Sequence, residues 1–417
     1  MARKVNTWSP SDRETEFENK NRLPGAGKNT MMSENGLTHT LTGLEAASQV
    51  PLPSADELAG RFTLRPNQNP ASDKEYREIM ESLTFGSHFG DHMAVADWKV
   101  GEGWSGHRVQ AFENLSLSPG AVVFHYGQEV FEGLKAYRHK DGSIWAFRPR
   151  YNAARLNASA RRLALPEIPE EDFVASIVDL VRADKRWVPT APGTSLYLRP
   201  FMIGTEPYLG VHSAREVKYL VIGSPSGAYF SGGETKGVSI WVDRHYHRAG
   251  PGGTGEAKCG GNYAASLLPQ NMAAEKGYEQ VCFLDTKRGE NLEELGGMNV
   301  FVVRADGSVH TPRLTGVILE GGTRSAICRL LRDSGTPVFE RDISLKSLVE
   351  DIRSGEVSEV FACGTAAVVT PIGRLGSDDF EVEVPCGPVT ASIHQRLVAI
   401  QNGEAPDPYG WTYHLCD

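Results

Sequence analysis

The stretch that most constrains this chain is residues 252–266, which have the sequence GGTGEAKCGGNYAAS. A single lysine, Lys258, lies between two pairs of glycines, and Tyr263 follows it by five residues. Glycine lets the backbone approach a ligand closely but costs conformational entropy, so this composition indicates an amine held at a defined place. The alternative is an ordinary lysine in a flexible, solvated surface loop, since most lysines are exposed.

Phosphate binding is one chemistry that such a loop suggests. The P-loop motif requires Gly-x-x-x-x-Gly-Lys followed by Ser or Thr, because its amides cradle phosphate and its hydroxyl meets magnesium. Ala257 and Cys259 stand where that motif needs a glycine and a hydroxyl. A nucleotide-binding module is therefore disfavoured.

A Schiff-base lysine is the second chemistry. A free lysine is mostly protonated at neutral pH, so as a nucleophile it needs a bound carbonyl and a pocket that disfavours the extra charge. Pyridoxal 5′-phosphate would supply that carbonyl together with an electron sink. Its site must also contain a carboxylate for the pyridine nitrogen and anion-binding groups for the phosphate. These parts would have to come from elsewhere in the chain.

The overall composition excludes several classes of protein. The formal net charge of −9 argues against a nucleic-acid binder, because neutralising phosphates requires a basic face. The sequence has no apolar run of about 18 residues, which predicts no membrane span. The six cysteines form no C-x-x-C pair, so neither a metal site nor a dithiol redox site is expected. Scattered thiols in an acidic protein fit a reducing cytoplasm.

The chain is predicted to consist of a tail and two domains of mixed α/β (α+β) type. Its first part is polar and contains many Pro and Gly residues, which predicts disorder, and we hypothesise that translation starts at Met31 or Met32. Regular structure is expected from residue 75 onward. The predicted parts are a disordered tail (1–60), a smaller N-terminal α/β domain (61–223), a Gly-, Ser- and Pro-rich interdomain loop (224–237) and a larger C-terminal domain (238–417).

Hydrophobic periodicity predicts the elements within these domains. Helices are expected over 150–163, 170–186, 323–334, 344–354 and 388–401, with Ser344 and Gly355 in cap positions. Strands are expected over 121–124, 195–203, 217–223, 238–242, 280–284, 299–304 and 359–363.

Two glycine-containing turns are candidates for anion binding. Gly321-Gly322-Thr323-Arg324 opens the predicted helix 323–334, where free amides and the helix dipole favour an anion. A simple helix cap by Thr323 is the alternative. Gly364-Thr365-Ala366-Ala367 follows the strand 359–363 and has a similar character, but it also fits an ordinary strand-to-helix turn.

Charged residues supply further candidates. Glu293 and Glu294 are carboxylates that could serve a pyridine nitrogen, or a solvated pair on a turn. Arg155 lies beside the apolar stripe of its helix and can face a cleft or water. Arg199 stands inside an apolar strand, where alternation places it on the same face as Tyr197. A buried arginine needs a partner, which would be an internal carboxylate or that of a substrate.

Together these segments resemble the branched-chain amino acid aminotransferases, a family of two-domain fold-type IV pyridoxal phosphate (PLP) enzymes. The resemblance extends from about residue 75 to the C-terminus and excludes the tail. Six stretches carry it in the family's order: HYGQEVFEGLKAY (125–137), FRPRYNAARL (147–156), LYLRP (196–200) with EPYLGV (206–211), the lysine loop, EELGGMNVF (293–301) and CGTAA (363–367).

The resemblance implies a residue for each part of a PLP site. Lys258 would form the Schiff base and shuttle the proton, and Tyr263 would hydrogen-bond the phenolic oxygen of the cofactor. Glu294, rather than Glu293, would meet the pyridine nitrogen. The phosphate would be bound by Arg155, Gly322, Thr323 and Thr365.

The resemblance also implies how substrates bind. The turn amides at Thr365 and Ala366 would receive the α-carboxylate. An apolar wall would suit leucine, isoleucine and valine, while Arg199 and the tyrosine hydroxyls would admit the distal carboxylate of glutamate. The residues that would line this pocket or its entrance are Tyr126, Phe131, Tyr197, Arg199 and Tyr229.

The implied protein is a homodimeric transaminase that exchanges amino groups between these amino acids and 2-oxoglutarate. A loop around Leu209 to Val211 would come from the neighbouring subunit, and the interdomain loop carrying Tyr229 would act as a lid. Ala367 and Thr370 replace the Cys-x-x-Cys of mammalian members, so their redox switch is not expected. Ser226 replaces an aromatic residue of some bacterial members, which leaves the pocket shape open.

Three alternatives remain at this point. A D-amino acid aminotransferase or an aminodeoxychorismate lyase would share the fold, although the LYLRP stretch and the chain length speak against both. A PLP-binding protein without turnover would bind the cofactor yet show no spectral change with leucine. A nucleotide-binding module would be supported only by measured binding of ATP.

Overall fold

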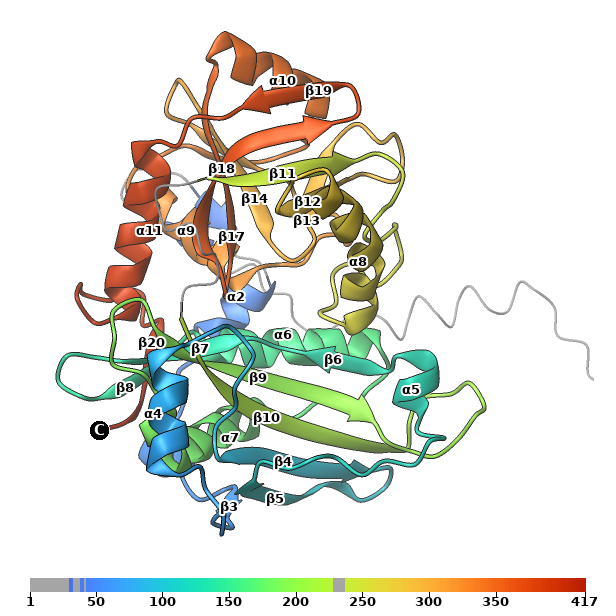
Figure 1. Cartoon of the computed structure of the whole chain (residues 1–417), viewed down its shortest axis with the longest axis vertical. Helices are drawn as coiled ribbons and strands as arrows, with labels where there is room; N and C mark the ends of the chain where they lie inside the picture. Colours follow the sequence, from blue (N-terminus) through green and yellow to red (C-terminus); the bar gives the residue numbers. More distant parts are fainter. Residues whose placement is uncertain (1–29, 33–37, 41–42, 228–236) are drawn as a thin grey trace, which may run out of the picture. The chain divides into compact units, whose positions relative to one another are not determined.

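The computed structural model describes residues 30–32, 38–40, 43–227 and 237–417 (Figure 1). The chain divides into two compact units. The unit Met1–Val50 contains strand β1 (Thr30–Met32), antiparallel to β2 (Thr38–Thr40), and helix α2 (Gly43–Ser48). Most of the predicted tail, and Tyr229 with most of the predicted interdomain loop, lie outside the described residues. The translation start stays a prediction.

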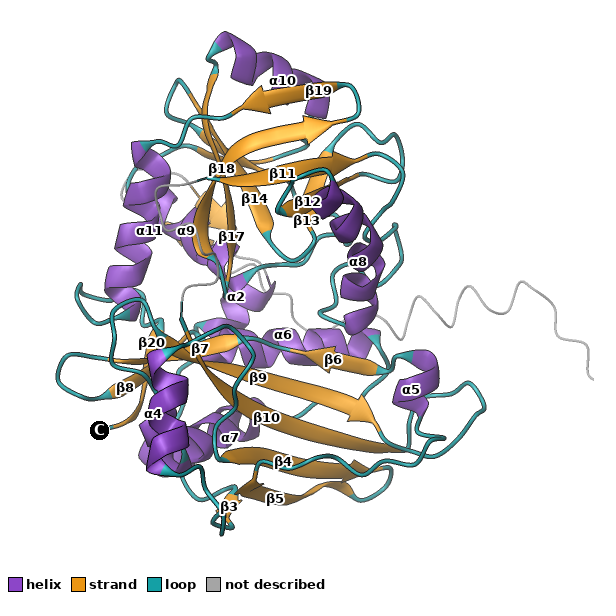
Figure 2. Ribbon diagram, in the orientation of Figure 1, coloured by secondary structure: helices purple, strands orange, loops and turns teal. Residues whose placement is uncertain are grey.

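The unit Pro51–Asp417 is built on two separate sheets, which Figure 2 shows in orange. The first has the order β20-β8-β7-β9-β10-β4-β5-β3, with β6 paired to β9, and only the β3–β5 pair is parallel. Its strands are β3 (Thr63–Leu64), β4 (His92–Lys99), β5 (Gly103–Ala111), β6 (Glu129–Phe131), β7 (Leu134–Arg138), β8 (Ile144–Phe147), β9 (Ser195–Gly204), β10 (Glu216–Ser226) and β20 (Thr412–Cys416). The C-terminal strand thus returns to the first sheet.

Helix α7 (Glu170–Ala183) packs on this sheet through an apolar stripe. The stripe Phe173, Ile177, Leu180 and Val181 of α7 is fully buried, at roughly 1.5–3 kcal/mol per side chain. Acidic residues fill the first turn of α7, where they complement the helix dipole. The helices of this half are α3 (Ala55–Leu58), α4 (Asp73–Glu81), α5 (Val122–Tyr126), α6 (Pro149–Arg162), α7 (Glu170–Ala183) and the short 3-10 helix η2 (Lys185–Trp187).

The second sheet has the order β13-β12-β11-β18-β17-β14-β15-β16, with β19 paired to β18. Helices α8 to α11 pack against its strands (Figure 2). The strands are β11 (Val238–Asp243), β12 (Gln280–Leu284), β13 (Leu292–Leu295), β14 (Asn299–Arg304), β15 (Val309–Thr311), β16 (Val338–Glu340), β17 (Val357–Gly364), β18 (Val368–Ser377) and β19 (Phe380–Glu383). The helices are α8 (Gly260–Glu275), α9 (Gly322–Asp333), α10 (Leu345–Ser354) and α11 (Pro388–Gln401).

This arrangement confirms the predicted mixed α/β class, and most predicted elements lie within a few residues of the observed ones. The Ser344 and Gly355 caps of α10 are also confirmed. The strand predicted over 121–124 is wrong, because these residues enter helix α5, which Gly127 ends in the left-handed conformation with φ of 55°. Structure also begins before residue 75: Ser54 and Glu57 form a capping box on α3.

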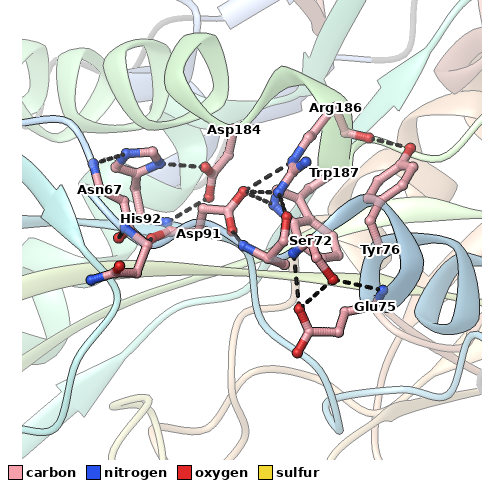
Figure 3. A network of polar contacts seen from close by, with 11 residues as sticks. Asn67, Ser72, Glu75, Tyr76, Asp91, His92, Asp184, Arg186 and Trp187 are labelled. Atoms are coloured by element: carbon pink, nitrogen blue, oxygen red, sulfur yellow. Dashed lines mark hydrogen bonds and ion pairs between the residues drawn. The ribbon is translucent and has the colours of Figure 1, made fainter.

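Buried polar contacts fasten the end of α7 to the start of β4 (Figure 3). The Asp91 carboxylate accepts hydrogen bonds from the indole of Trp187 at 2.7 Å and from Arg186 at 2.7 Å. The Asp184 carboxylate contacts the His92 ring nitrogen at 2.6 Å and accepts the His92 backbone N–H at 3.0 Å. Because each carboxylate accepts hydrogen bonds from residues of another element, the network fixes the position of the C-terminal end of α7 relative to β4.

None of the helices among the described residues has the length and apolar character needed to cross a membrane.

Candidate active site

The lysine loop is held by backbone contacts to the first sheet and α6. The Lys258 N–H donates to the hydroxyl of Ser159 at 2.9 Å, and its carbonyl accepts the N–H of Phe131 at 2.9 Å. Two glycines are required by close approach: a Cβ at Gly255 would lie 2.3 Å from the Val317 carbonyl oxygen, and one at Gly260 would meet the Glu129 carboxylate. The glycines therefore set the lysine against a fixed framework, which excludes the flexible-loop alternative.

The Lys258 amine lies between two aromatic rings. Its Nζ donates to the Tyr263 hydroxyl at 2.7 Å, so the tyrosine five residues along the chain reaches the lysine head group. The same Nζ lies 4.5 Å from the centroid of the Phe131 ring. The Phe131 and Tyr263 rings are 4.9 Å apart. Three predicted site residues thus meet around one amine.

Glu294 is a buried carboxylate on β13 rather than one of a solvated pair on a turn. Its Oε1 forms an ion pair with Arg248 Nη1 at 2.8 Å and accepts a hydrogen bond from the Leu319 N–H at 2.9 Å. Burial raises the pKa of Glu294, and the positive charge of Arg248 opposes that rise. A buried carboxylate with one cationic partner can face a ring nitrogen that carries a proton.

Glu293 precedes it on the same strand and differs in its electrostatic surroundings. Burial, followed by the charges of Asp285 and Glu294, raises the pKa of Glu293 to about 7. Since successive strand residues point to opposite faces, Glu293 and Glu294 occupy separate environments. Arg248 pairs with Glu294 and not with Glu293, in keeping with the choice of Glu294.

Arg155 is buried and paired inside the protein, so of the two positions that the helix pattern allowed, it does not face water. Its Nε and Nη2 donate to the two oxygens of Glu132 at 2.7 and 2.8 Å, and Nη1 donates to the Glu320 carbonyl at 3.0 Å. Asn152 also donates to Glu132, at 2.7 Å. Burial alone would lower the pKa of Arg155, but the charge and hydrogen bonds of Glu132 outweigh it and raise the pKa.

Arg155 opens onto a basic cavity that we call the phosphate cavity. The described residues that line it include Arg155, Arg148 and Lys135, and none of them is a carboxylate. Helix α9 begins there at Gly322, and no side chain caps its N-terminus, so the predicted cap by Thr323 is wrong. The lining residues are Gly133, Leu134, Lys135, Tyr137, Phe147, Arg148, Tyr151, Asn152, Arg155, Gly322, Thr323, Gly364, Thr365, Val368 and Gln401.

The turn at Gly364 to Ala367 joins strands β17 and β18, so it is not the strand-to-helix turn considered from the sequence. The Thr365 hydroxyl donates to the Gly133 carbonyl at 3.1 Å, and Lys135 Nζ donates to the Ala366 carbonyl at 3.1 Å. These two bonds tie the turn of the second sheet to the segment that ends β6 and begins β7.

Arg199 and Tyr197 share one face of β9, as strand alternation predicts. Arg199 Nη2 donates to the Tyr197 hydroxyl at 3.2 Å, and the guanidinium lies 4.7 Å from the centroid of the Phe131 ring. Arg199 forms no ion pair within the described part of the chain, and its buried Nε has no hydrogen-bond partner there. The internal salt bridge considered from the sequence is therefore absent from that part.

Tyr126 lies apart from this cluster. It is on α5, it is 42% exposed, and its hydroxyl donates to the carbonyl of Leu209. Tyr229 lies outside the described residues. Ser226 is buried at the end of β10, where its hydroxyl donates to the Ser224 carbonyl at 3.0 Å.

Sequence reasoning missed several residues of this region. Glu132 and Lys135 lie within the stretch HYGQEVFEGLKAY, where charged residues inside a strand-like run were a usable signal. Arg148, with a left-handed φ of 53°, donates to the Gly322 carbonyl at 2.9 Å. No sequence signal distinguished Arg248, because its role depends on Glu294 being buried.

Comparison with known proteins gives a consistent result. The family model described as amino-transferase class IV matches residues 129–375. The branched-chain-amino-acid aminotransferase of Mycolicibacterium smegmatis is 49% identical over 361 residues, which cover 85% of this chain and 98% of that protein. The chain belongs to the branched-chain-amino-acid aminotransferases of class IV.

Solved structures of such aminotransferases resemble this one closely. The Escherichia coli branched-chain amino acid aminotransferase superposes with a TM-score of 0.62 at 30% identity, over 77% of this chain and 99% of that one. A second branched-chain amino acid aminotransferase, solved in complex with N-(5′-phosphopyridoxyl)-L-glutamate, gives a TM-score of 0.62 at 26% identity, over 77% and 99%. This aminotransferase is accordingly a PLP-dependent transferase with a fold-type IV architecture.

The residues present fit PLP chemically. The phosphate cavity offers cationic side chains, a threonine hydroxyl and an uncapped helix N-terminus, and none of its described lining residues is an acid that would repel a phosphate. Lys258 provides the amine, and Glu294 provides a buried carboxylate. These are the three kinds of group that a pyridoxal phosphate site needs.

Proposed function

We propose that this aminotransferase reversibly transfers amino groups between L-leucine, L-isoleucine or L-valine and 2-oxoglutarate. The names of its relatives support the branched-chain substrates. The observation that carries the proposal is the Phe131 ring, which has Lys258 Nζ at 4.5 Å and the Arg199 guanidinium at 4.7 Å from its centroid. The apolar Phe131 ring suits the aliphatic side chain of a branched-chain substrate. The Arg199 cation, which forms no ion pair within the described residues, suits the distal carboxylate of glutamate in the same pocket.

The proposed cofactor contacts follow the geometry of the cluster. When bound, pyridoxal phosphate supplies an aldehyde for the amino group and a ring that accepts the electron pair left on the substrate Cα. Arg155, Gly322, Thr323 and Thr365 would bind its phosphate. Glu294, paired with Arg248, would accept a hydrogen bond from the protonated pyridine nitrogen.

The proton transfer is assigned to Lys258. Its amine would take the proton from the substrate Cα and deliver it to the former aldehyde carbon of the cofactor, on the other side of the amino nitrogen. Tyr263, whose hydroxyl is 2.7 Å from Nζ, would orient the amine during this transfer. Thr365 and Ala366 would present their amides to the α-carboxylate, which would fix the Cα–H bond near Lys258.

The proposed assembly is a homodimer. Leu209 and Val211 are 67% and 84% exposed, and Tyr126 is joined to the same loop through the Leu209 carbonyl. We expect this loop, with Tyr126, to enter the neighbouring active site. We also propose the division of the chain into a tail, two domains and an interdomain loop, in which Tyr229 would form part of a lid. A cytoplasmic location is proposed as well, and the free thiols support it.

A half-reaction tests this function. The purified protein loaded with PLP is mixed with leucine alone, and its visible absorption is followed. We expect leucine, isoleucine and valine each to bleach the band and 2-oxoglutarate to restore it, while D-leucine does not. A protein that binds PLP but does not respond to L-leucine would be a carrier without turnover and would refute the proposal.

A further inference from the structure

Lys135 is a buried lysine with no assigned task. It lies on β7 and is 9% exposed. An ammonium group carries three donors, yet the single hydrogen bond that the Lys135 ammonium donates within the described part of the chain goes to the Ala366 carbonyl at 3.1 Å. Keeping a buried cation with so few partners is costly, which indicates a role beyond packing.

Lys135 also lies between two cavities. It lines the phosphate cavity and a second cavity behind the Gly364–Ala367 turn. No carboxylate of the described residues lines either cavity. The second cavity is lined by Lys135, Tyr137, Gly193, Thr194, Ser195, Gly227, Ala366, Ala367, Val368, Val369, Thr370, Pro371, His394, Val398, Gln401 and Asn402.

The turn beside Lys135 has a strained backbone. Val368, at its end, has φ of 57°, a left-handed conformation that is unfavourable for a β-branched residue and costs roughly 1–3 kcal/mol. Such a conformation persists only where surrounding contacts hold it. The bonds of Lys135 to Ala366 and of Thr365 to Gly133 are two contacts that do so.

We propose that Lys135 is a positioning residue for the substrate α-carboxylate: it clamps the Thr365–Ala366 turn and places a positive charge behind it. This inference rests on the proposed function, because that turn receives the α-carboxylate only if the substrate is an α-amino acid. Lys135 would therefore help the site to select carboxylates over neutral groups of the same shape.

The charge of Lys135 has a pH dependence. Burial lowers the pKa of Lys135 to about 8, so the ammonium is lost as the pH rises through that value. Affinity for carboxylates should fall over the same range. The titratable or charged groups around it are Tyr137 on β7, Tyr197 opposite on β9, Arg148, Tyr151 and Arg155 on or beside α6, and His394 on α11.

The test compares Lys135→Met and Lys135→Arg in the PLP-loaded enzyme. The control is Lys140→Met, at an 85% exposed side chain whose ammonium is 3.1 Å from Glu404. Inhibition constants are measured for 4-methylvalerate, which is leucine without its amino group, and for its neutral amide. The KM and kcat for leucine and the Kd for PLP are measured alongside.

We expect Lys135→Met to weaken 4-methylvalerate about 10- to 100-fold and to raise the leucine KM similarly, with binding of the amide and of PLP almost unchanged. Lys135→Arg should restore most of this affinity and remove its decline through pH 8. Lys140→Met should behave as wild type.

Two results would overturn the inference. Equal losses for the acid and the amide would give Lys135 a purely structural role. Weaker PLP binding with an unchanged preference for the acid would assign it to the phosphate instead. Wild-type turnover of leucine is measured first, because its absence refutes the proposed function. The acid-to-amide comparison is then made with analogues of whichever amino donor the enzyme uses.

Discussion

Replacing Glu132 with glutamine tests how the cofactor-binding arginine is held. The Glu132 carboxylate is fully buried and accepts two hydrogen bonds from Arg155, one from Asn152 at 2.7 Å and one from the Gly133 N–H at 3.1 Å. Glutamine keeps the shape but removes the charge. Arg155 cannot lose its proton in a protein, so a buried guanidinium would be left without its counter-ion.

The cost of that change follows from the burial of both partners. Removing one member of a buried ion pair typically costs about 3–5 kcal/mol of unfolding free energy. At roughly 2 °C per kcal/mol for a large chain, the Tm of the cofactor-free variant should fall by about 6–10 °C. Added PLP should return part of this loss, because its phosphate would give Arg155 a new anion.

Thermal unfolding with and without PLP is the assay, and Glu167→Gln is the matched control. Glu167 also pairs with an arginine, at 2.6 Å from Arg161, but both side chains are about half exposed. Such surface pairs contribute about 0–1 kcal/mol, so the control should change Tm by no more than about 2 °C. Equal Tm changes in the two variants would refute the reasoning that burial makes the Glu132–Arg155 pair costly to break.

Two further predictions concern charges near the site. Arg199→Met should lower kcat/KM for glutamate by about 10- to 100-fold while changing that for leucine only slightly, as measured in separate half-reactions; parallel losses for both substrates would contradict the proposed dual pocket. Burial raises the pKa of Glu293 to about 7, so the folded protein favours the neutral form of this side chain. This preference stabilises the fold fully below the unfolded-state pKa of 4.5, and the stabilisation is lost as the pH rises through 7. Glu293→Gln stays neutral, so its Tm relative to wild type should rise by a few degrees between about pH 5 and pH 8; a difference that is the same at both values would show that Glu293 is not buried at a cost.

Local features were predictable from the sequence. The lysine loop and the caps of α10 depend on residues close together in the chain, as does the strand that puts Tyr197 and Arg199 on one face. The prediction over 121–124 failed because a short apolar run does not distinguish a strand from a helical turn.

Long-range pairing was beyond the reach of periodicity. The helix pattern left Arg155 free to face water because Glu132, its partner, lies on another element. The Glu293–Glu294 pair was interpretable as a turn because both neighbours along LEEL are apolar and no alternation is visible. Lys135 and Arg248 gain their roles only when distant segments, at Ala366 and Glu294, fold against them.

The central claim is that the Lys258 amine carries out the proton transfer. Its most direct test is a single-turnover reaction of PLP-loaded wild type and Lys258→Ala with L-leucine, followed by visible absorption and by detection of the 2-oxo acid. The circular dichroism spectra of the two proteins should match, since the Lys258 side chain is only half-buried and its fixed backbone is retained. Wild type should form one equivalent of 2-oxo acid and the variant none; formation of 2-oxo acid by the variant at a rate near that of wild type would contradict the account.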